Sequence, residues 1–486
     1  MTLRGLAGET RWMDATALAH LVRSEEVKAV ELVEAAIERI EAHNPALNAV
    51  VTEWFEHARS AAADGPPGGP FSGVPFLLKD FMAAYAGQAA SSNGNHRLKE
   101  LTRPVSGDST MVARLRAAGL VTVGRTNTPE FASQPTTEPA AWGATRNPWD
   151  PAYSTGGSSG GAAAAVASGM VPFAHASDGS GSIRIPAACC GLVGLKPSRG
   201  RISAGPSGDE SGPAVELCVS RTVRDTAALL DAVQGPGVGD LVVAPQPSRP
   251  YTDELAADPA PLRIGVLDHA PGGDPVHPDC AAAVHEAAAL LEELGHRVEI
   301  SWPAVFATTT VEDAGPLGLA ATSPMANSFA HLAEVLGREV TAADVEPVTW
   351  ARLQRLRRTG ATDVARAQAA STRYRRDVQQ WWADGHDLLL TPTTADPAPR
   401  IGSFGDDLAA LEALTTRYVA FTRPFNITGQ PAISLPLSRT ASGLPVGVQL
   451  AAAYGCEDVL IAVAAQLERA RPWAHTFSHL RFDRSA

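Results

Sequence analysis

The sequence has no long apolar run, no excess of positive charge and no recognisable export segment. No stretch of about 18 consecutive apolar residues occurs, so no membrane-spanning helix is expected. Residues 1–21 contain no apolar core followed by a small-residue cleavage site, which excludes a secretory signal peptide. The formal net charge is −12, whereas nucleic-acid-binding proteins present a basic face. We therefore expect a cytoplasmic protein that binds neither membranes nor nucleic acids.

Cysteine is scarce as well. The cysteines are odd in number and form no C-x-x-C pair, so the sequence predicts free, buried thiols in a reducing compartment. They are Cys189, Cys190, Cys218, Cys280 and Cys456. Neither an H-E-x-x-H motif nor a Cys/His cluster is present, so we expect no metal site and no cofactor.

The composition is that of a folded globular protein. Apolar residues make up 45% of the chain and charged residues 19%, which supplies a large core and excludes a disordered or coiled-coil chain. Helical and strand-like patterns alternate along the chain, as in α/β proteins. The sequence therefore predicts one large α/β domain over residues 1–486, with a mixed sheet.

Local patterns place the expected elements. Asp14 is expected to cap a helix over 15–23, and Asp108 a helix over 109–119. The further helices that we expect cover 27–44, 162–169, 274–295 and 457–470. The expected strands cover 71–81, 120–124, 262–267, 296–300, 387–391, 432–436 and 445–450. Residues 262–300 thus form one β-α-β unit, and the Pro/Gly-rich segment 234–261 is expected to be a surface excursion rather than a hinge.

Lysine is rare, and one lysine stands in an unusual place. Only four of the 40 basic residues are lysines, and Lys79 lies within the apolar segment FLLKDFM. This lysine could reach the surface or pair with Asp80. Alternatively it is desolvated, which would lower its pKa and allow it to act as a base near neutral pH.

The segment Gly156–Gly161 (GGSSGG) precedes an alanine-rich helical stretch. It could be a flexible loop, but glycines before a helix present N–H groups to an anion or a developing oxyanion. The segment also matches the G-x-S-x-G elbow of α/β-hydrolases, with Ser158 or Ser159 at its centre. That elbow requires a preceding strand, and residues 150–155 are not expected to form one.

A second small-residue segment, Ser177–Pro186, contains Gly-Ser-Gly followed by Ser182. It could be a tight turn, or it could hold a serine nucleophile whose preceding amides bind the oxyanion. A histidine base is not indicated, because His175, the histidine nearest these loops, has no spacing that ties it to a serine. No S-x-x-K pair is present, so a lysine from another segment remains as the base.

Taken together, these segments resemble the amidase signature family of serine hydrolases. The resemblance runs from ELVEAAIERIEAHNPALNAV through SGVPFLLKD and STGGSSGG to DGSGSIRIPAACCGLVGLKPSRGR, and ends with FNITGQPAISLPLSRTASGLPVGVQL. It implies a mixed central sheet covered by helices on both faces, with the signature core at about 72–205. Segments at about 302–345 and 400–425, and the loop 126–133, are expected to line the substrate pocket.

The resemblance also assigns roles to individual residues. It implies Lys79 as the catalytic lysine, Ser158 as a bridging serine after a cis peptide bond, and Ser182 as the nucleophile. The remaining implied positions are Gly179, Ser180 and Gly181 in the oxyanion hole, Ala132 and Ser133 at the substrate, and Asp178 and Arg184 as supports. Ser180 stands where the commonest family pattern has glycine, which reduces local backbone freedom.

The expected activity is amide hydrolysis through an acyl-enzyme. Within the family, the motifs are closest to hydrolases of cyclic, aryl and acyl amides, which favours a small, neutral or apolar amide as substrate. Alternatives are the glutaminase subunit of a tRNA-dependent amidotransferase, for which Ile185 replaces the usual glutamine, and an acyltransferase. A non-catalytic binding protein is disfavoured because all three catalytic positions are filled. Homodimers are common in the family, so a homodimer is one option.

Overall fold

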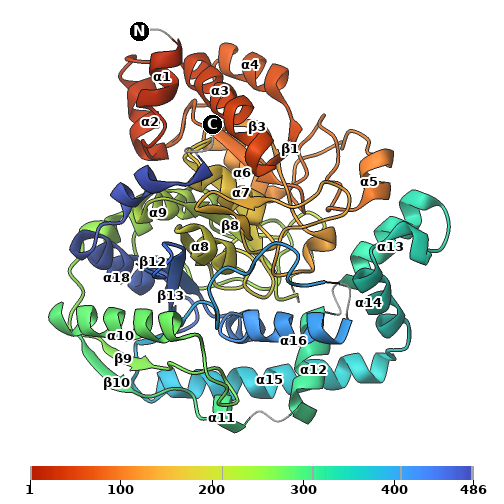
Figure 1. The fold of residues 1–486 in the computed structure, drawn as a ribbon, viewed down its shortest axis with the longest axis vertical. Coiled ribbons are helices and arrows are strands. Elements are labelled where there is room, and N and C mark those ends of the chain that lie inside the picture. The colour runs from red at the N-terminus through yellow and green to blue at the C-terminus, as the bar shows by residue number, and fades with distance from the viewer. Residues whose placement is uncertain are drawn as a thin grey trace.

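The fold is known from a computed structural model, which describes residues 3–208, 210, 212–308, 311–322, 325–405 and 408–482 (Figure 1). The strands in these residues are β1 (Val50–Glu53), β2 (Pro75–Lys79), β3 (Val121–Thr126), β4 (Arg146–Asn147), β5 (Asp150–Ser154), β6 (Phe173–Asp178), β7 (Val193–Lys196), β8 (Val215–Ser220), β9 (Arg263–Val266), β10 (Arg297–Ile300), β11 (Leu388–Pro392), β12 (Ala432–Arg439) and β13 (Pro445–Ala452).

Helices are distributed along the whole chain. The α-helices of the described residues are α1 (Leu3–Glu9), α2 (Ala15–Arg23), α3 (Ala29–Leu47), α4 (Phe55–Ala63), α5 (His96–Leu101), α6 (Thr110–Ala117), α7 (Gly160–Ala167), α8 (Arg184–Cys190), α9 (Val223–Val233), α10 (Pro278–Glu293), α11 (Val305–Thr308), α12 (Val311–Thr322), α13 (Met325–Leu336), α14 (Pro347–Arg357), α15 (Ala361–Ala383), α16 (Leu408–Tyr418), α17 (Arg423–Thr428) and α18 (Glu457–Ala470). Short 3-10 helices are η1 (Glu130–Ala132), η2 (Tyr251–Ala256), η3 (Ala342–Asp344) and η4 (Ala474–His479).

One mixed sheet forms the centre of the molecule. Within the described chain it has 11 strands in the order β1-β3-β2-β6-β8-β7-β12-β13-β11-β9-β10, while β4 and β5 form a separate pair. Parallel pairing joins β2 to β3 and β6, and β9 to β10 and β11. Helices cover both faces, so the predicted α/β class is confirmed. In Figure 1, α1–α4 lie at one end of the molecule and α10, α11 and α15 at the other.

Two short helices pack in the interior against the sheet. Every residue of α7 and α8 is buried. α7 contacts β2 and β6, and α8 contacts β12 and β13. A helix that is buried on all sides needs small or apolar residues all round, and the sequences GGAAAAVA and RIPAACC supply them except at Arg184. These two helices follow the two serine-containing loops directly.

The predicted elements are mostly present, and two details were wrong. Asp14 caps α2 as expected, by accepting from the N–H of Ala17. The cap of α6, however, is Ser109, because Asp108 instead accepts from the N–H of Ala86 and pairs with Arg116. Residues 150–154 form β5, although the turn-rich sequence did not predict a strand. Because β5 pairs with β4 and with residues near Arg400, and not with a strand of the central sheet, it does not create an α/β-hydrolase elbow.

The five cysteines form no disulfide bonds. Cys189, Cys190, Cys218 and Cys280 are free and buried, as predicted, whereas Cys456 is free and only half-buried. Across the described ranges, no helix combines the length and the apolar character that crossing a bilayer requires. In the same ranges, no group of three or more His, Cys, Asp or Glu side chains is arranged to hold a metal ion.

Candidate active site

Lys79 is the last residue of β2 and is completely buried. Its side chain has 0% exposure, so it does not reach the surface, and among the described residues no ion pair joins it to Asp80, which instead accepts from Ser92. Its Nζ lies 2.7 Å from Ser158 Oγ and 2.9 Å from Ser177 Oγ. Burial lowers the pKa of Lys79 from its ordinary value of 10.5 to about 7, and the nearby Asp178 and Glu216 partly offset this effect. The amine is therefore partly neutral at neutral pH.

Ser158 lies in the loop that leads into α7. The Gly157–Ser158 peptide bond is cis, as expected. Backbone contacts hold the loop, because Thr128 donates to the carbonyl of Ser158 at 3.0 Å and the N–H of Ser159 donates to the carbonyl of Ser182 at 3.3 Å. A β-carbon on Gly157 would come within 2.4 Å of the Thr136 carbonyl oxygen. Glycine at this position therefore lets the loop approach its neighbour, and the loop is packed rather than flexible.

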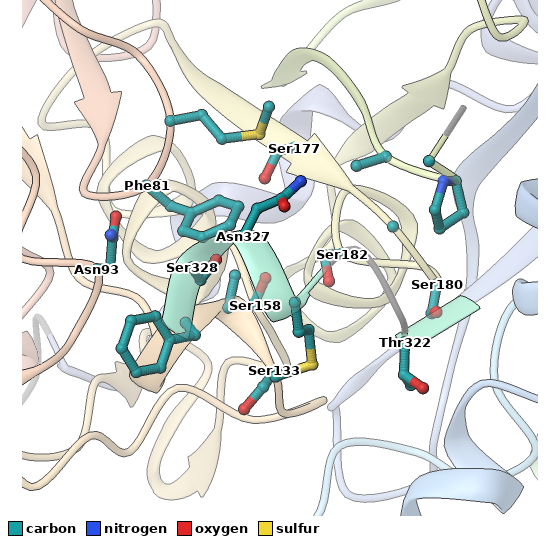
Figure 2. Close-up of a pocket in the computed structure, with 18 of the residues that line it drawn as sticks. Phe81, Asn93, Ser133, Ser158, Ser177, Ser180, Ser182, Thr322, Asn327 and Ser328 are labelled. Carbon is teal, nitrogen blue, oxygen red and sulfur yellow. The ribbon is translucent and has the colours of Figure 1, made fainter. Parts of the chain in front are cut away.

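Ser182 lies between β6 and α8, on the wall of a large cavity. That cavity has a volume of about 960 Å³, and Ser158, Ser177, Gly179, Ser180 and Ser182 all line it (Figure 2). In the described chain, no hydrogen bond joins the Ser158 and Ser182 hydroxyls. Catalytic hydrogen bonds are often incomplete without substrate. The structure therefore brings the lysine and both serines to one cavity, with only the lysine–Ser158 contact already formed.

The amides before Ser182 differ from one another. The N–H of Gly181 donates to Asp178 Oδ1 at 2.6 Å, and Gly181 does not line the cavity. The sequence-based prediction that Gly181 contributes to an oxyanion hole therefore loses its geometric support. Gly179, Ser180 and Ser182 line the cavity, and their N–H groups have no partner among the described residues. Ser180 has no positive φ, so a serine fits at this position although the family resemblance implied glycine.

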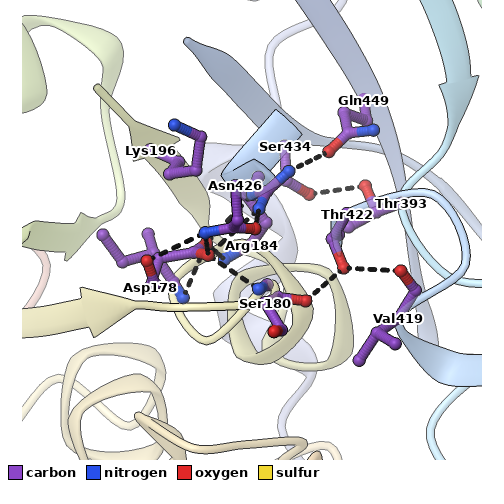
Figure 3. A network of polar contacts seen from close by, with 12 residues as sticks. Asp178, Ser180, Arg184, Lys196, Thr393, Val419, Thr422, Asn426, Ser434 and Gln449 are labelled. Carbon is purple, nitrogen blue, oxygen red and sulfur yellow. Dashed lines mark hydrogen bonds and ion pairs between the residues drawn. The ribbon is translucent and has the colours of Figure 1, made fainter. Parts of the chain in front are cut away.

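Asp178 and Arg184 form a buried ion pair behind this loop (Figure 3). Arg184 Nε lies 2.9 Å from Asp178 Oδ2, and both side chains have 0% exposure. Arg184 also donates to Asn426 Oδ1 at 2.6 Å and to Gln449 Oε1 at 2.8 Å. The Arg184 guanidinium, together with hydrogen bonds, holds the pKa of Asp178 well below its usual range although burial acts in the opposite direction. The pair fixes the loop to α17 and β13 and does not line the cavity.

Two other buried cations or bases are not positioned to react. His175 is buried in β6, where Nδ1 accepts from the N–H of Lys79 and Nε2 lies 3.0 Å from Glu216 Oε1. It is a core histidine, and no hydrogen bond joins it to either serine among the described residues. Lys196 is also buried, and burial lowers its pKa. Its Nζ donates to the Pro197 carbonyl, and Lys196 does not line the cavity.

The loop 131–134 forms another part of the cavity wall. Ala132 and Ser133, which the sequence suggested as substrate-binding residues, both line the cavity. The Ser133 hydroxyl is buried and has no hydrogen-bond partner in the described chain, and its carbonyl accepts from Arg352 Nη1 at 2.7 Å. These two residues are therefore placed where a ligand could contact them.

The expected variable segments also border the cavity. Residues 315–331 contribute Gly318, Leu319, Thr322 and Met325, and residues 412–423 contribute Glu412 and Arg423. Residues 309–310, 323–324 and 406–407, which fall within the expected segments 302–345 and 400–425, lie outside the described residues, as do the chain ends 1–2 and 483–486. Trp381 and Trp382 belong to a hydrophobic core cluster, Trp350 packs against another, and none of the three lines the cavity.

Sequence reasoning missed the residues that support the loops. They are Ser177, Thr422, Asn426 and Gln449. Thr422 Oγ1 donates to the Ser180 carbonyl at 2.6 Å. Three of the four lie within or beside the quoted motifs SDGSGS, FNITGQP and PVGVQL, so the signal was present. Nothing in their spacing, however, shows which distant side chain they contact.

Comparisons with known proteins extend over nearly the whole chain. The sequence pattern of the family described as Amidase matches residues 31–461. The chain is 45% identical over 476 residues to a 6-aminohexanoate-cyclic-dimer hydrolase of Paenarthrobacter ureafaciens, with 95% of each protein covered. The solved structure of a 6-aminohexanoate cyclic dimer hydrolase is similar with a TM-score of 0.91 and 44% identity, covering 96% of this chain and 98% of that one. A bacterial aryl acylamidase of the amidase signature family is similar with a TM-score of 0.88 and 29% identity, covering 96% and 98%. The resemblance inferred from the motifs is confirmed.

Proposed function

This chain belongs to the amidase signature family and is a hydrolase that acts on carbon–nitrogen bonds, and from this premise we propose that it cleaves a small amide through Ser182, Ser158 and Lys79. The observation that carries the proposal is the buried Lys79 amine, 2.7 Å from the Ser158 hydroxyl, on the same cavity as Ser182. A neutral amine can donate one N–H to Ser177 while its lone pair accepts the Ser158 proton. Lys79 is then a base that needs no histidine.

The proposed reaction proceeds in two halves. Ser182 Oγ attacks the amide carbonyl, its proton passes to Ser158 Oγ, and the Ser158 proton passes to Lys79 Nζ. The amides of Gly179, Ser180 and Ser182 receive the oxyanion. The protons then return along the same path to the leaving amine, which departs and leaves an acyl group on Ser182. Water hydrolyses that ester and releases the carboxylic acid.

The cavity supports an amide with an apolar body. Its volume of about 960 Å³ suits a small molecule. The side chains of Phe81, Met82, Phe131 and Met325 line it together with the serines. The named relatives act on a cyclic amide dimer and on aryl acylamides. We therefore expect a small cyclic, aryl or acyl amide rather than a polar peptide.

A screen of primary, aryl, cyclic and peptide amides tests the proposal, with glutamine included. The Ser182→Ala variant should lose turnover of every substrate by at least about a thousandfold, because the nucleophile is absent. Its circular dichroism and melting temperature should match those of the wild type. Substantial activity in Ser182→Ala would exclude the proposed nucleophile.

Added hydroxylamine distinguishes hydrolysis from acyl transfer. An acyl-enzyme would give hydroxamate in competition with the acid, and an enzyme that transfers the acyl group only to amines would release no acid when the amine is absent.

A further inference from the structure

One wall of the active-site cavity carries a cluster of arginines. Arg352 and Arg355 belong to α14, and Arg423 is the first residue of α17. Glu412 is the carboxylate on this wall, and Glu216, the other carboxylate that lines the cavity, is paired with His175. In a protein whose net charge is −12, a wall with three guanidinium groups and one carboxylate is unusual.

Only one of the three arginines has an ionic partner in the described chain. Arg355 Nη1 pairs with Glu412 Oε1 at 3.0 Å near the surface. Arg352 Nη1 donates to the uncharged Ser133 carbonyl. The Nε of Arg423 is buried, and its guanidinium has no hydrogen bond or ion pair with any described residue. Two cations on this wall therefore form no ion pair within the described part of the chain.

The electrostatics of Arg352 and Arg423 are consistent with an absent anion. Burial, together with repulsion from the neighbouring arginines, lowers the pKa of each to about 10, and Glu412 partly offsets this effect at Arg352. Both groups still carry their charge at neutral pH. A carboxylate bound between them would relieve the repulsion and form charge-assisted hydrogen bonds.

Further polar atoms on the same cavity are unsatisfied. The hydroxyls of Ser133 and Thr415 are buried, line the cavity, and have no hydrogen-bond partner among the described residues. Buried polar groups are almost always paired in folded proteins. Several unpaired groups facing one cavity indicate that a polar ligand completes them.

These groups lie close to the proposed reaction centre. Arg423 directly follows Thr422, whose hydroxyl bonds to the Ser180 carbonyl beside the nucleophile. Arg352 is tied to Ser133 in the loop 131–134. The same cavity is also lined by apolar residues, among them Phe131 and Val419. A ligand that reaches from Ser182 to the arginines therefore needs an apolar middle and an anionic end.

From this arrangement we infer that the enzyme takes amides that carry a carboxylate away from the scissile bond, and that Arg352 and Arg423 bind this carboxylate. The inference rests on the proposed hydrolysis at Ser182. It refines the expected neutral or apolar amide into one with an apolar body and a charged end.

The test compares matched anionic and neutral substrates. Succinyl, glutaryl and adipoyl p-nitroanilides place a carboxylate on the acyl side, and butanoyl, pentanoyl and hexanoyl p-nitroanilides are their neutral counterparts. For the leaving amine, N-hexanoyl-β-alanine is the substrate with a carboxylate, and N-hexanoyl-propylamine is its neutral counterpart. The wild type should prefer at least one anionic series by about tenfold or more in kcat/KM, mainly through KM.

Variants identify the residues responsible. Arg423→Gln and Arg352→Gln should each reduce the ratio of anionic to neutral kcat/KM by about tenfold, and Arg423→Lys should restore part of it because the charge is kept. Arg358→Gln, an exposed arginine just after α14, is the matched control and should leave the ratio unchanged. Melting temperatures identify any variant that fails to fold. If one of the two arginine-to-glutamine variants does not fold, the other variant still tests the site.

Three results would overturn the inference. In the first, the wild type hydrolyses neutral substrates with a kcat/KM at least as high as that for anionic ones in both series. In the second, the arginine variants lower kcat/KM equally for anionic and neutral substrates. In the third, Arg358→Gln reduces the ratio of anionic to neutral kcat/KM as much as Arg423→Gln does. If the wild type hydrolyses none of these compounds, the carboxylate site is tested by binding instead: the Ser182→Ala variant is titrated with adipate and, separately, with hexanamide. Adipate binding that disappears in the Ser182→Ala/Arg423→Gln double variant supports the carboxylate site even though the proposed function has failed. Equal binding of both compounds, or binding of neither, refutes the site.

Discussion

At the scale of single residues, the active site depends on the burial of one amine. Lys79 is surrounded by apolar neighbours in sequence, and the fold encloses it completely. An exposed lysine would keep a pKa near 10.4 and would be almost fully protonated at neutral pH. Burial makes its neutral form accessible.

This burial predicts a pH dependence. The active form is the neutral amine, and the pKa of Lys79 is lowered to about 7. Below that value kcat/KM should rise about tenfold for each pH unit, and above it the profile should level off. The measurement is kcat/KM on an aryl amide from about pH 5.5 to 8.5.

Lys79→Arg is the control for this profile. Arginine cannot lose its proton in proteins, so the variant should be inactive at every pH. A flat wild-type profile across the range, or activity in Lys79→Arg, would contradict the assignment of Lys79 as the base.

At the scale of elements, the loop between β6 and α8 is held by its own residues and by a distant segment of the chain. Gly181 has φ +127, a region that favours glycine, and its N–H serves Asp178. Asn426 Nδ2 donates to the Asp178 carbonyl at 2.9 Å, and Thr422 holds Ser180. The α17 segment thus shapes a loop more than 200 residues earlier in the chain.

Gly181→Ala should therefore disrupt the loop. The added β-carbon would lie 2.4 Å from Thr422 Oγ1 and would adopt an unfavourable φ. We expect destabilisation of about 1–3 kcal/mol and a large loss of kcat, measured by thermal melting and by turnover.

Gly179→Ala is the matched variant for stability. Its added β-carbon meets nothing closer than 3.7 Å, and its melting temperature should stay near that of the wild type. Equal melting temperatures for the two variants would show that neither φ nor the Thr422 contact constrains the loop.

At the scale of the whole molecule, the central sheet brings the site together. β2 and β6 are parallel neighbours, so Lys79 and Asp178, which end these strands, reach the same edge of the sheet. The C-terminal strands β12 and β13 complete the sheet beside β7. A buried ion pair joins these distant parts, because Arg201 after β7 contacts Glu457 at the start of α18 at 3.0 Å.

Removing that pair tests the long-range connection. Glu457→Ala leaves the buried Arg201 guanidinium without its carboxylate and should cost about 3–5 kcal/mol, measured as a lower denaturant midpoint. Asp458→Ala, on the same helical turn but half-buried, should cost less than about 1 kcal/mol. Equal midpoints for the two variants would argue against a stabilising role for the Arg201–Glu457 pair.

Much of the fold could be predicted from local patterns, and the errors have physical causes. Helices such as α3 and α10 follow apolar periodicity, and β11–β13 follow short apolar runs. The cap of α6 was wrong because two adjacent residues, Asp108 and Ser109, can both cap, and Arg116 draws Asp108 away. β5 was missed because it owes its pairing to β4 rather than to its own turn-rich sequence.

The sequence by itself determined the chemical groups and the local elements: a lysine in an apolar strand, two serines in glycine-rich loops, and the motifs of an amide hydrolase. Only the tertiary structure decided which groups meet. It placed Lys79 against Ser158 and Ser177, engaged the Gly181 amide with Asp178, and left Arg352 and Arg423 on the cavity wall without an ion pair to any described residue. The physical reason is the distance along the chain over which each kind of interaction acts. Propensity and capping act over a few residues, whereas burial and pairing depend on segments that the chain brings together from hundreds of residues apart.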